Sequence, residues 1–181
     1  MIRFGPRTGF ARGSRLVTYQ RITMADPLYE KACRLRERVL LEPIGMTMQK
    51  LAELYPGFEE QFEHFVAVTT TPGGERVIGC ALLLPKTDRP GFGKLMQMAV
   101  DHQRQGEGIG QRLVIEAESR AFGELGLEGL FCYSQKTATG FYEKLGWEGE
   151  GDEFVEAGIP HLTMIIRRPP VEASEEPIPA W

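Results

Sequence analysis

The sequence predicts a single mixed α/β (α+β) domain built around one sheet of six or seven strands, with about four flanking helices. Two observations predict this fold class. β-Rich runs alternate along the chain with segments whose apolar residues recur every three or four positions, so strands and helices are interleaved. The 181 residues, of which 42% are hydrophobic and 25% charged, suffice for one sizeable core but not comfortably for two.

The first half of the chain predicts a strand, two helices and a hairpin. Residues 15–23 contain β-branched and aromatic side chains and are predicted as a strand. Apolar residues at helical spacing predict a helix over 27–41, and a shorter helix over 46–58 stops before its proline. Two β-rich runs, 63–70 and 76–85, flank a Pro-Gly-Gly turn and therefore predict a hairpin.

The second half predicts three strands and two helices. Residues 93–100 form a strand that ends where a glycine-rich run begins. From Ile109, apolar residues recur every fourth position for about four turns, which is typical of an amphipathic helix. A strand over 128–134, a short helix over 138–146 that ends at a glycine, and a last strand over 161–167 follow.

The two ends of the chain differ in composition from the rest, and this difference sets the domain boundaries. Residues 1–14 are rich in Gly and Arg and are predicted to form a mobile basic arm. Residues 169–181 are acidic and proline-rich, which predicts an unpacked tail. The folded domain is therefore expected to span 15–168.

Charge, cysteine content and hydropathy exclude several classes of protein. The net charge of −4 argues against a broad nucleic-acid surface. The three cysteines, Cys33, Cys80 and Cys132, lie far apart, so neither a disulfide framework nor a metal site is predicted. No apolar run approaches ~20 residues, and the N-terminus lacks the apolar core of a signal peptide. We therefore expect a cytoplasmic protein that binds neither membrane nor nucleic acid.

The run QGEGIGQ, residues 105–111, places three glycines at alternate positions between a strand and a helix. Unpaired N–H groups in a first helical turn and the helix dipole favour an anion, and glycines let a phosphate approach the backbone. Neither the Walker nor the Rossmann spacing is present, which disfavours an unrelated nucleotide-binding domain. A tight connection that needs positive φ is the structural alternative. Asp101 is expected to cap this turn.

This motif, the preceding MQMAV and the later ATGFYEKLGW resemble the GNAT superfamily of acetyl-CoA-dependent N-acetyltransferases. Gln105 to Gly110 match the family's phosphate-binding signature, Q/R-x-x-G-x-G/A, and the resemblance covers 15–168. It implies a GNAT-like domain that uses acetyl-CoA as the acetyl donor, needs no metal and allows direct attack by a primary amine in a ternary complex. The acceptor would be a small-molecule amine or a peptide N-terminus, and a homodimer is a common family trait.

The resemblance also implies which residues bind the cofactor. Backbone amides from Gly106 to Gln111 would hold the pyrophosphate, while Met98 and Val100 would offer main-chain hydrogen bonds to the pantetheine arm. Gln135 stands where many relatives have an asparagine that faces this arm. The residues expected at the cofactor are Met98, Ala99, Val100, Gln105, Gly106, Glu107, Gly108, Ile109, Gly110, Gln111, Gln135 and Ala138. The candidates for the outer phosphates are Arg104, Arg112 and Lys136.

Two residues are candidates for proton transfer. Tyr142 matches the family's tyrosine near the CoA sulfur, and with a reference pKa of about 10 it would stay protonated and act as a general acid. Its structural alternative is packing of the last helix together with Phe141. His161 has the best intrinsic pKa for a base, and its alternative is a histidine that opens an apolar strand. Glu153 and Glu156 are expected in the loop before that strand.

Two functions from different classes stay open at this point. One is an acyltransferase, favoured by the presence of Tyr142. The other is a non-catalytic acyl-CoA-binding module that senses or regulates, which stays open because the sequence offers no compelling base. Members of the family hold the acceptor between the first two helices and the loop before the last strand, here roughly 27–60 and 148–161. These segments carry both charge signs and several aromatics, so they do not define the acceptor.

Overall fold

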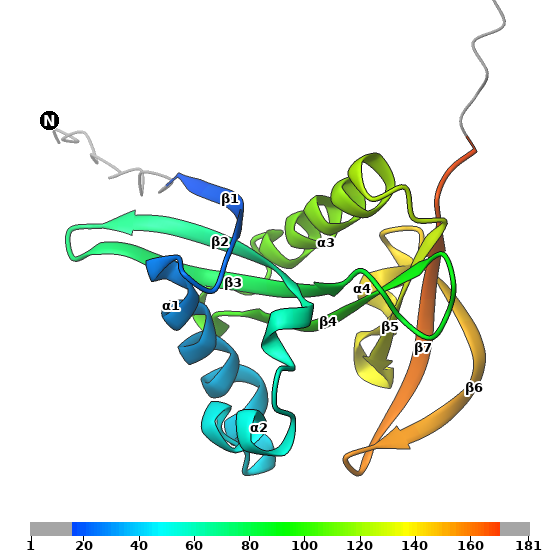
Figure 1. Cartoon of the computed structure of the whole chain (residues 1–181), viewed down its shortest axis with the longest axis horizontal. Coiled ribbons are helices and arrows are strands. Elements are labelled where there is room, and N and C mark those ends of the chain that lie inside the picture. The colour runs from blue at the N-terminus through cyan, green and yellow to red at the C-terminus, as the bar shows by residue number, and fades with distance from the viewer. Residues whose placement is uncertain (1–15, 171–181) are drawn as a thin grey trace, which may run out of the picture.

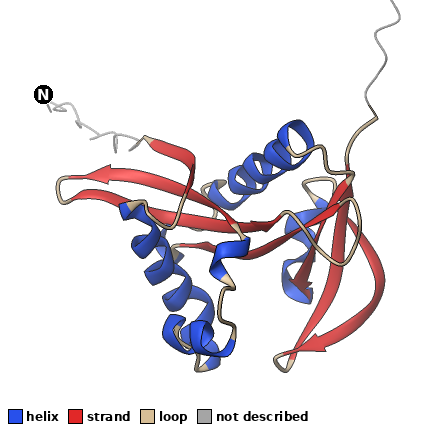
Figure 2. Ribbon diagram, viewed as in Figure 1, coloured by secondary structure: helices blue, strands red, loops and turns tan. Residues whose placement is uncertain are grey.

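The computed structural model describes residues 16–170, and a mixed sheet of seven strands forms the centre of this part of the chain (Figure 1, Figure 2). The strands are β1 (Val17–Ile22), β2 (Glu63–Thr71), β3 (Gly74–Leu84), β4 (Phe92–Val100), β5 (Gly129–Gln135), β6 (Glu148–Glu156) and β7 (Ile159–Arg167). The α-helices in the same residues are α1 (Pro27–Arg36), α2 (Met48–Leu54), α3 (Ile109–Ser119) and α4 (Thr139–Glu143). The predicted fold class is confirmed. The predicted arm, and all of the predicted tail after residue 170, lie outside the described residues.

The strand order is β1-β2-β3-β4-β5-β7-β6, and every neighbouring pair is antiparallel except β4 with β5. These two parallel strands pair only from Phe92 to Lys94 on β4 and from Gly129 to Phe131 on β5. Beyond Lys94 they separate, and their facing edges have no strand partner. A wedge therefore opens in the middle of the sheet, toward the C-terminal ends of β4 and β5.

Two glycines allow β4 and β5 to meet at the apex of this wedge. A Cβ at Gly129 would collide with the ring of Phe92. A Cβ at Gly93 would lie 2.9 Å from the side chain of Leu127 and 3.0 Å from that of Leu130. Because protein interiors are closely packed, a larger residue at either position would push the two strands apart.

The strand β4 contains an irregularity where it lines the wedge. Its ladder with β3 pairs Met96 with Leu82 and Ala99 with Cys80, so the two residues between Met96 and Ala99 face only one residue of β3. One of them, Gln97, has a φ of 46°, in the left-handed region that non-glycine residues rarely adopt. This is the geometry of a β-bulge, which locally disrupts pairing and re-aims the backbone.

Helices pack on both faces of the sheet (Figure 2). On one face α3 and α4 cover a core that includes Leu95, Leu113, Leu130, Trp147 and Met164. On the other face α1 packs against β3 and β4, and the core there includes Leu28, Leu35, Val66, Val68, Cys80 and Ala99. The wedge between β4 and β5 is therefore open to both layers of helices.

The predicted first helix is regular only in part. The Asp26 side chain caps its N-terminus by accepting a hydrogen bond from the Leu28 N–H at 2.8 Å. The α-helix ends at Arg36 and continues as a π-helical turn over Glu37–Leu41, and α3 continues in the same way over Arg120–Glu124. Within the described part of the chain, every helix is too short or too polar to cross a lipid bilayer.

The expectation of a loop before the last strand is wrong. The segment Glu148–Glu156 forms the edge strand β6, which turns through Ala157 and Gly158 into β7. Glu153 and Glu156 thus lie on a strand. Most side chains of β6 are exposed, so the strand lacks the apolar alternation that would reveal it, and its pairing with β7 determines its conformation.

Candidate active site

A cavity of about 760 Å³ lies where β4 and β5 separate. Its walls come from the end of β4, the glycine turn with the start of α3, the end of β5, α4 and one residue of β7. The predicted site residues that line it are Met98, Ala99, Val100, Gln105, Gly106, Gly108, Ile109, Gly110, Gln111, Gln135, Ala138, Tyr142 and His161. Glu107 is the exception, because its carboxylate turns to Arg104 and accepts from Nε at 2.8 Å. The structure thus brings all residues predicted for cofactor binding and proton transfer, except Glu107, to a single cavity, and of the three cations suggested for the outer phosphates only Arg104 lines it.

The glycine turn presents bare backbone to this cavity. Gly106 and Gly108 have φ values of 82° and 78°, and a Cβ built on either would meet no atom within 4 Å. Gly108 is the N-cap of α3 and supplies no side-chain acceptor, so the N–H groups that follow it lack partners within the helix. Gly110 differs, because a Cβ there would lie 3.5 Å from Phe141 in ordinary contact. Positive φ and open space occur together, and unpaired amides beside open space suit a phosphate.

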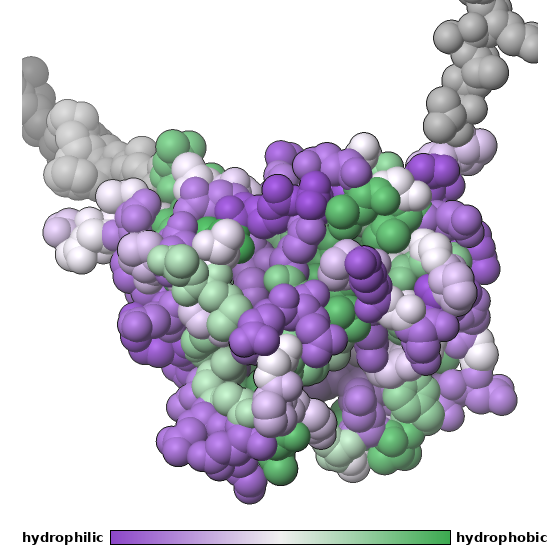
Figure 3. Space-filling view, viewed as in Figure 1, coloured by the Kyte–Doolittle hydropathy of each residue, from purple (hydrophilic) through white to green (hydrophobic). Residues whose placement is uncertain are grey.

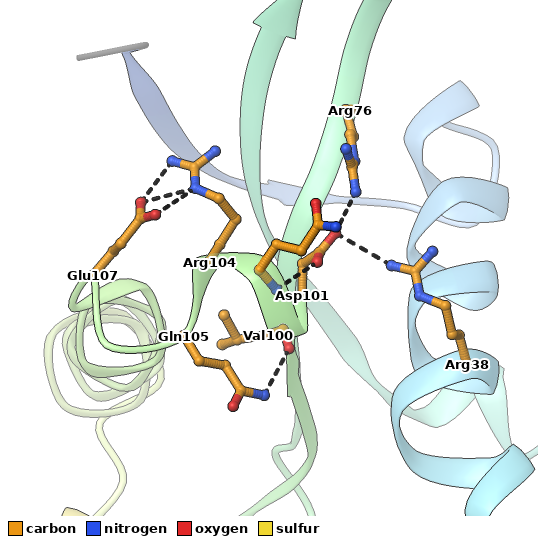
Figure 4. A network of polar contacts seen from close by, with 8 residues as sticks. Arg38, Arg76, Val100, Asp101, Arg104, Gln105 and Glu107 are labelled. Carbon is orange, nitrogen blue, oxygen red and sulfur yellow. Dashed lines mark hydrogen bonds and ion pairs between the residues drawn. The ribbon is translucent and has the colours of Figure 1, made fainter. Parts of the chain in front are cut away.

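Side chains hold the glycine turn to neighbouring elements (Figure 4). Asp101 accepts a hydrogen bond from the backbone N–H of Gln103 at 3.1 Å. It also forms ion pairs with Arg76 and, at 3.3 Å, with Arg38. Gln105 Nε2 donates to the Val100 carbonyl at 3.2 Å. Burial alone would raise the pKa of Asp101, but this amide and Arg76 outweigh it and hold the pKa below its ordinary value. Asp101 thus caps the turn just before the glycines as a charged group.

The cations that the sequence suggested for the outer phosphates are each paired with a glutamate. The pairs are Arg104–Glu107 at 2.8 Å, Arg112–Glu116 at 2.8 Å, and Lys136–Glu153. Arg112 and Glu116 lie four residues apart on α3, the spacing that brings side chains together on a helix, whereas Arg104 and Glu107 pair across the glycine turn. Each of these cations thus has a carboxylate beside it in a pair that is partly exposed to solvent.

Tyr142 is buried on α4 and still lines the cavity. Its ring centroid lies 5.0 Å from that of Phe141 and 5.3 Å from that of Trp147, so the packing interpretation also holds. Burial raises the pKa of Tyr142 well above its ordinary value, and the neighbouring Cys132 thiol raises it further. The hydroxyl is therefore protonated at neutral pH and able to donate. Burial also raises the pKa of Cys132 to about 12, so this thiol is not a nucleophile at neutral pH.

His161 lies on β7 opposite Gln135 of β5. Its Nδ1 is 2.8 Å from the carbonyl oxygen of Ile159, and because a carbonyl only accepts, Nδ1 is assigned the hydrogen and Nε2 remains an acceptor in the neutral ring. Nε2 is 3.9 Å from the carboxylate of Glu156, beyond hydrogen-bond distance. The Phe154 ring stacks on the imidazole with centroids 5.8 Å apart. His161 can therefore accept a proton at Nε2 beside the cavity.

Sequence reasoning missed a buried polar network against β4. The Arg36 side chain is fully buried; Nη1 and Nη2 donate to Glu59 at 2.7 and 2.6 Å, and Nε donates to Gln97 Oε1 at 2.8 Å. The Tyr29 hydroxyl donates to Glu59 at 3.1 Å. Burial opposes ionisation of Glu59, but Arg36 outweighs it and keeps the pKa of this carboxyl below its ordinary value. Arg36 follows the buried Ala32 by four residues, and a charge on an apolar helix stripe is a signal for such a partner.

Aromatic and apolar side chains lie at the cavity on the side of β5, β6 and the turn after α1. Tyr133 lines the cavity, is 42% exposed and packs edge-on against Phe154 with centroids 5.0 Å apart. The Lys94 ammonium lies 3.5 Å from the centre of the Tyr133 ring, and burial lowers the pKa of Lys94. Val39 and Leu40 line the cavity from the π-helical turn. Figure 3 shows the surface hollowed between α2 and the β6–β7 hairpin, which gives this side an opening to solvent.

The fold and the cavity together define an α/β domain that can hold an anionic ligand across the edge of a parted sheet. The family model of the acetyltransferase (GNAT) domain matches residues 46–168. The chain belongs to the GNAT acetyltransferase family.

Individual relatives agree with this assignment. The uncharacterized protein YyaT of Bacillus subtilis is 26% identical over 149 residues, which is 80% of this chain and 92% of that protein. The uncharacterized N-acetyltransferase YjcF of the same organism is 32% identical over 108 residues, 59% of this chain and 71% of that protein. The crystal structure of an aminoglycoside 6'-N-acetyltransferase complexed with coenzyme A superposes with a TM-score of 0.66 at 16% identity, covering 84% of this chain and 99% of that one.

Proposed function

We propose that this protein transfers an acetyl group from acetyl-CoA to a primary amine by direct attack in a ternary complex. The observation that carries the proposal is a single cavity that joins the glycine turn, the unpaired edge of β4 and Tyr142. The amides of the glycine turn suit a diphosphate, and the free N–H groups of β4 suit a thioester carbonyl. The hydroxyl of Tyr142 suits a leaving thiolate. Membership of the GNAT family and the coenzyme A in the aminoglycoside 6'-N-acetyltransferase structure support this donor.

The residues of the wedge would hold the donor along its length. The amides between Gly106 and Gln111 would bind the diphosphate, and the open space at the glycines supports this fit. The main chain of Met98 and Val100 would bind the pantetheine arm, with Ala99, Gln135 and Ala138 beside it. The Val100 carbonyl already accepts from Gln105 and keeps a second lone pair for the arm. Bound acetyl-CoA supplies an activated thioester.

Tyr142 would act as the general acid. Its raised pKa keeps the hydroxyl protonated, so it can donate to the thiolate that leaves. A thiol with a reference pKa of about 8.5 already departs readily as the thiolate. Donation by Tyr142 would therefore contribute at most the ~10²–10⁴-fold that is usual for general acid catalysis.

The acceptor amine must lose a proton before or during attack. A lysine-like amine with a pKa of ~10.4 costs about 4.6 kcal/mol to deprotonate at pH 7, whereas an α-amine near 7.8 costs about 1 kcal/mol. His161 would take this proton at Nε2, which the Nδ1 contact with Ile159 leaves available. A small-molecule amine or a peptide N-terminus would enter from the side of Tyr133.

A non-catalytic acyl-CoA sensor is the alternative function. The observation that favours it is the 3.9 Å distance between His161 and Glu156, because no carboxylate accepts a hydrogen bond from this ring within residues 16–170. A carboxylate partner is a common way to raise the basicity of an active-site histidine. In this alternative the cavity would bind the ligand and would not turn it over.

Thermal unfolding with four ligands tests the donor. At a hundred times its Kd, a ligand should add about 2.7 kcal/mol to the free energy of unfolding, which raises Tm by about 5–11 °C for a domain of this size. We expect this shift with CoA and acetyl-CoA and not with NAD or ATP. A shift only with NAD or ATP would contradict the proposal. Release of free thiol from acetyl-CoA over a panel of amines then separates the enzyme from the sensor.

A further inference from the structure

We propose that Arg36 is a positioning residue for acyl transfer, because it fixes the bulge of β4 against which the donor thioester would lie. The inference rests on the proposed function and adds a residue that no sequence motif assigned. Arg36 itself does not line the cavity, so it would act through Gln97, which does.

The contacts of Arg36 divide between two partners. Two of its nitrogens bind Glu59 at 2.7 and 2.6 Å, so the buried charge is neutralised by a bidentate pair. The remaining nitrogen, Nε, donates to Gln97 Oε1 at 2.8 Å. The ion pair satisfies the charge and leaves Nε as a fixed donor, because a guanidinium held at two points cannot rotate.

Gln97 needs such an anchor because of its backbone conformation. A φ of 46° is unfavourable for a side chain with a Cβ, and such residues persist where the surrounding structure fixes them. Neither Gln97 nor Met98 has a paired residue on β3, and β4 has no partner on its β5 side beyond Lys94. The strand ladders therefore do not hold this stretch of backbone, and the side-chain contact with Arg36 does.

This unpaired stretch is also where hydrogen-bond donors could face a thioester. A donor stabilises developing charge on an oxygen only if it is held in place before the reaction begins. Arg36 ends α1, and Glu59 lies between α2 and β2, so the anchor of the bulge comes from the helical layer beside the acceptor side of the cavity. The same π-helical turn that follows Arg36 carries Val39 and Leu40 into the cavity wall.

The test changes Gln97, because loss of Arg36 would leave the Glu59 carboxylate without its cation and could unfold the protein. Gln97→Met removes the acceptor for Arg36 Nε at nearly constant side-chain length, and Gln97→Glu restores an oxygen acceptor. Gln49→Met is the matched control, since Gln49 is exposed on α2 and its side chain donates a hydrogen bond to Glu53 at 2.9 Å. Each variant is measured for acetyl-CoA affinity by calorimetry, kcat by thiol release, and the carbonyl stretching frequency of bound ¹³C-labelled acetyl-CoA.

We expect Gln97→Met to lower kcat by about ten- to a hundredfold, because a misplaced donor loses its transition-state contact. Acetyl-CoA affinity should change by less than about threefold, since the substitution alters no residue of the glycine turn between Gly106 and Gln111. The carbonyl frequency should move toward that of free acetyl-CoA, and hydrogen exchange of a peptide over 95–99 should quicken in the free protein. Gln97→Glu should recover most of the rate, and Gln49→Met should match the wild type.

Three outcomes would overturn the positioning role. The first is an unchanged kcat and carbonyl frequency in Gln97→Met. The second is a loss of acetyl-CoA affinity as large as the loss of kcat, which indicates general damage to the site. The third is a Gln97→Glu variant no better than Gln97→Met. If the wild type binds no acetyl-CoA, the proposed function fails and the positioning role fails with it, whereas the three outcomes above arise only in an active wild type.

Discussion

The two sides of the cavity hold their geometry by different means. On the side of the glycine turn the groups proposed to bind the diphosphate are backbone amides, and ion pairs such as Arg112–Glu116 lie nearby at the surface. On the side of the β4 bulge, Gln97 accepts a hydrogen bond from the fully buried Arg36, which also pairs with Glu59, whose side chain is 14% exposed. The glycine turn depends on local sequence and backbone conformation. The bulge depends on side chains that are distant along the chain and packed inside the fold, so a substitution there should lower the free energy of unfolding more.

Removal of the buried cation should give the largest effect. Arg36→Met leaves the Glu59 carboxylate, 14% exposed, without its cation, and breaking such a pair costs about 3–5 kcal/mol, or about 6–20 °C in Tm for a domain of this size. Calorimetric unfolding measures this loss. Arg112→Met is the control, because its side chain is 56% exposed and its pair should contribute about 0–1 kcal/mol. Equal losses in the two variants would erase the contrast between the two sides.

Loss of the Tyr142 hydroxyl should slow the reaction without stopping it. Tyr142→Phe keeps the packing with Phe141 and Trp147 but removes the proton donor, so kcat should fall by about ten- to a hundredfold. Acetyl-CoA affinity should stay unchanged, and thiol release measures the rate. Tyr133→Phe, on the more exposed side of the cavity, should change KM for the acceptor and leave kcat nearly unchanged. A Tyr142→Phe enzyme with the wild-type rate would remove this residue from the mechanism.

A side chain at Gly108, which has a positive φ, should weaken CoA binding through the glycine turn without affecting the β4 bulge. Gly108→Val forces a β-branched residue to a φ of 78° or shifts the turn, and CoA affinity should fall by about tenfold or more. Gly110→Ala is the matched control: Gly110 lies inside α3, where its Cβ would fit at 3.5 Å from Phe141. Calorimetric titration with CoA should therefore separate the two variants. Equal affinity in both would show that the turn does not bind the diphosphate.

The charge on Asp101 should produce the smallest effect, and a pH-dependent one. Its pKa is lowered in the folded state, so it stabilises the fold above its unfolded pKa of about 3.9 and loses this effect as pH falls through the folded value. Asp101→Asn keeps the cap and removes the charge, and should cost about 1 kcal/mol at pH 7. The difference in free energy of unfolding between the wild type and Asp101→Asn, measured with urea, should become smaller below about pH 4. A constant difference down to pH 2 would show that the charge of Asp101 is not its cause.

Local patterns in the sequence predicted most of the fold and the backbone part of the site. Six of the seven strands in residues 16–170 follow recognisable β-rich runs, and the glycine turn is readable because its residues are adjacent. One of the three ion pairs could also have been foreseen, since Arg112 and Glu116 stand four residues apart within the predicted helix. Features that depend on residues close together in the chain were therefore predictable from the sequence.

The bulge and β6 could not be predicted because their causes are distant along the chain. Arg36 meets Glu59 and Gln97 across 23 and 61 residues, and only the packing of α1 on the sheet brings them together. The strand β6 is rich in acidic residues and glycine, and pairing with β7 gives it its conformation. For the same reason the sequence identified Tyr142 and His161 by type but could not show that they share one cavity.

Two glycines lie where β4 and β5 pair, at the closed end of the wedge. Gly93 and Gly129 do not line the cavity, yet an added Cβ at either would collide with side chains packed where the two strands meet. An added methyl group at either glycine should move β4 and β5 apart where they meet, and the distance between their C-terminal ends should increase further. If the protein transfers acyl groups as proposed, a wider cavity should accept longer acyl chains, and the acyl chain-length preference of Gly129→Ala measures this.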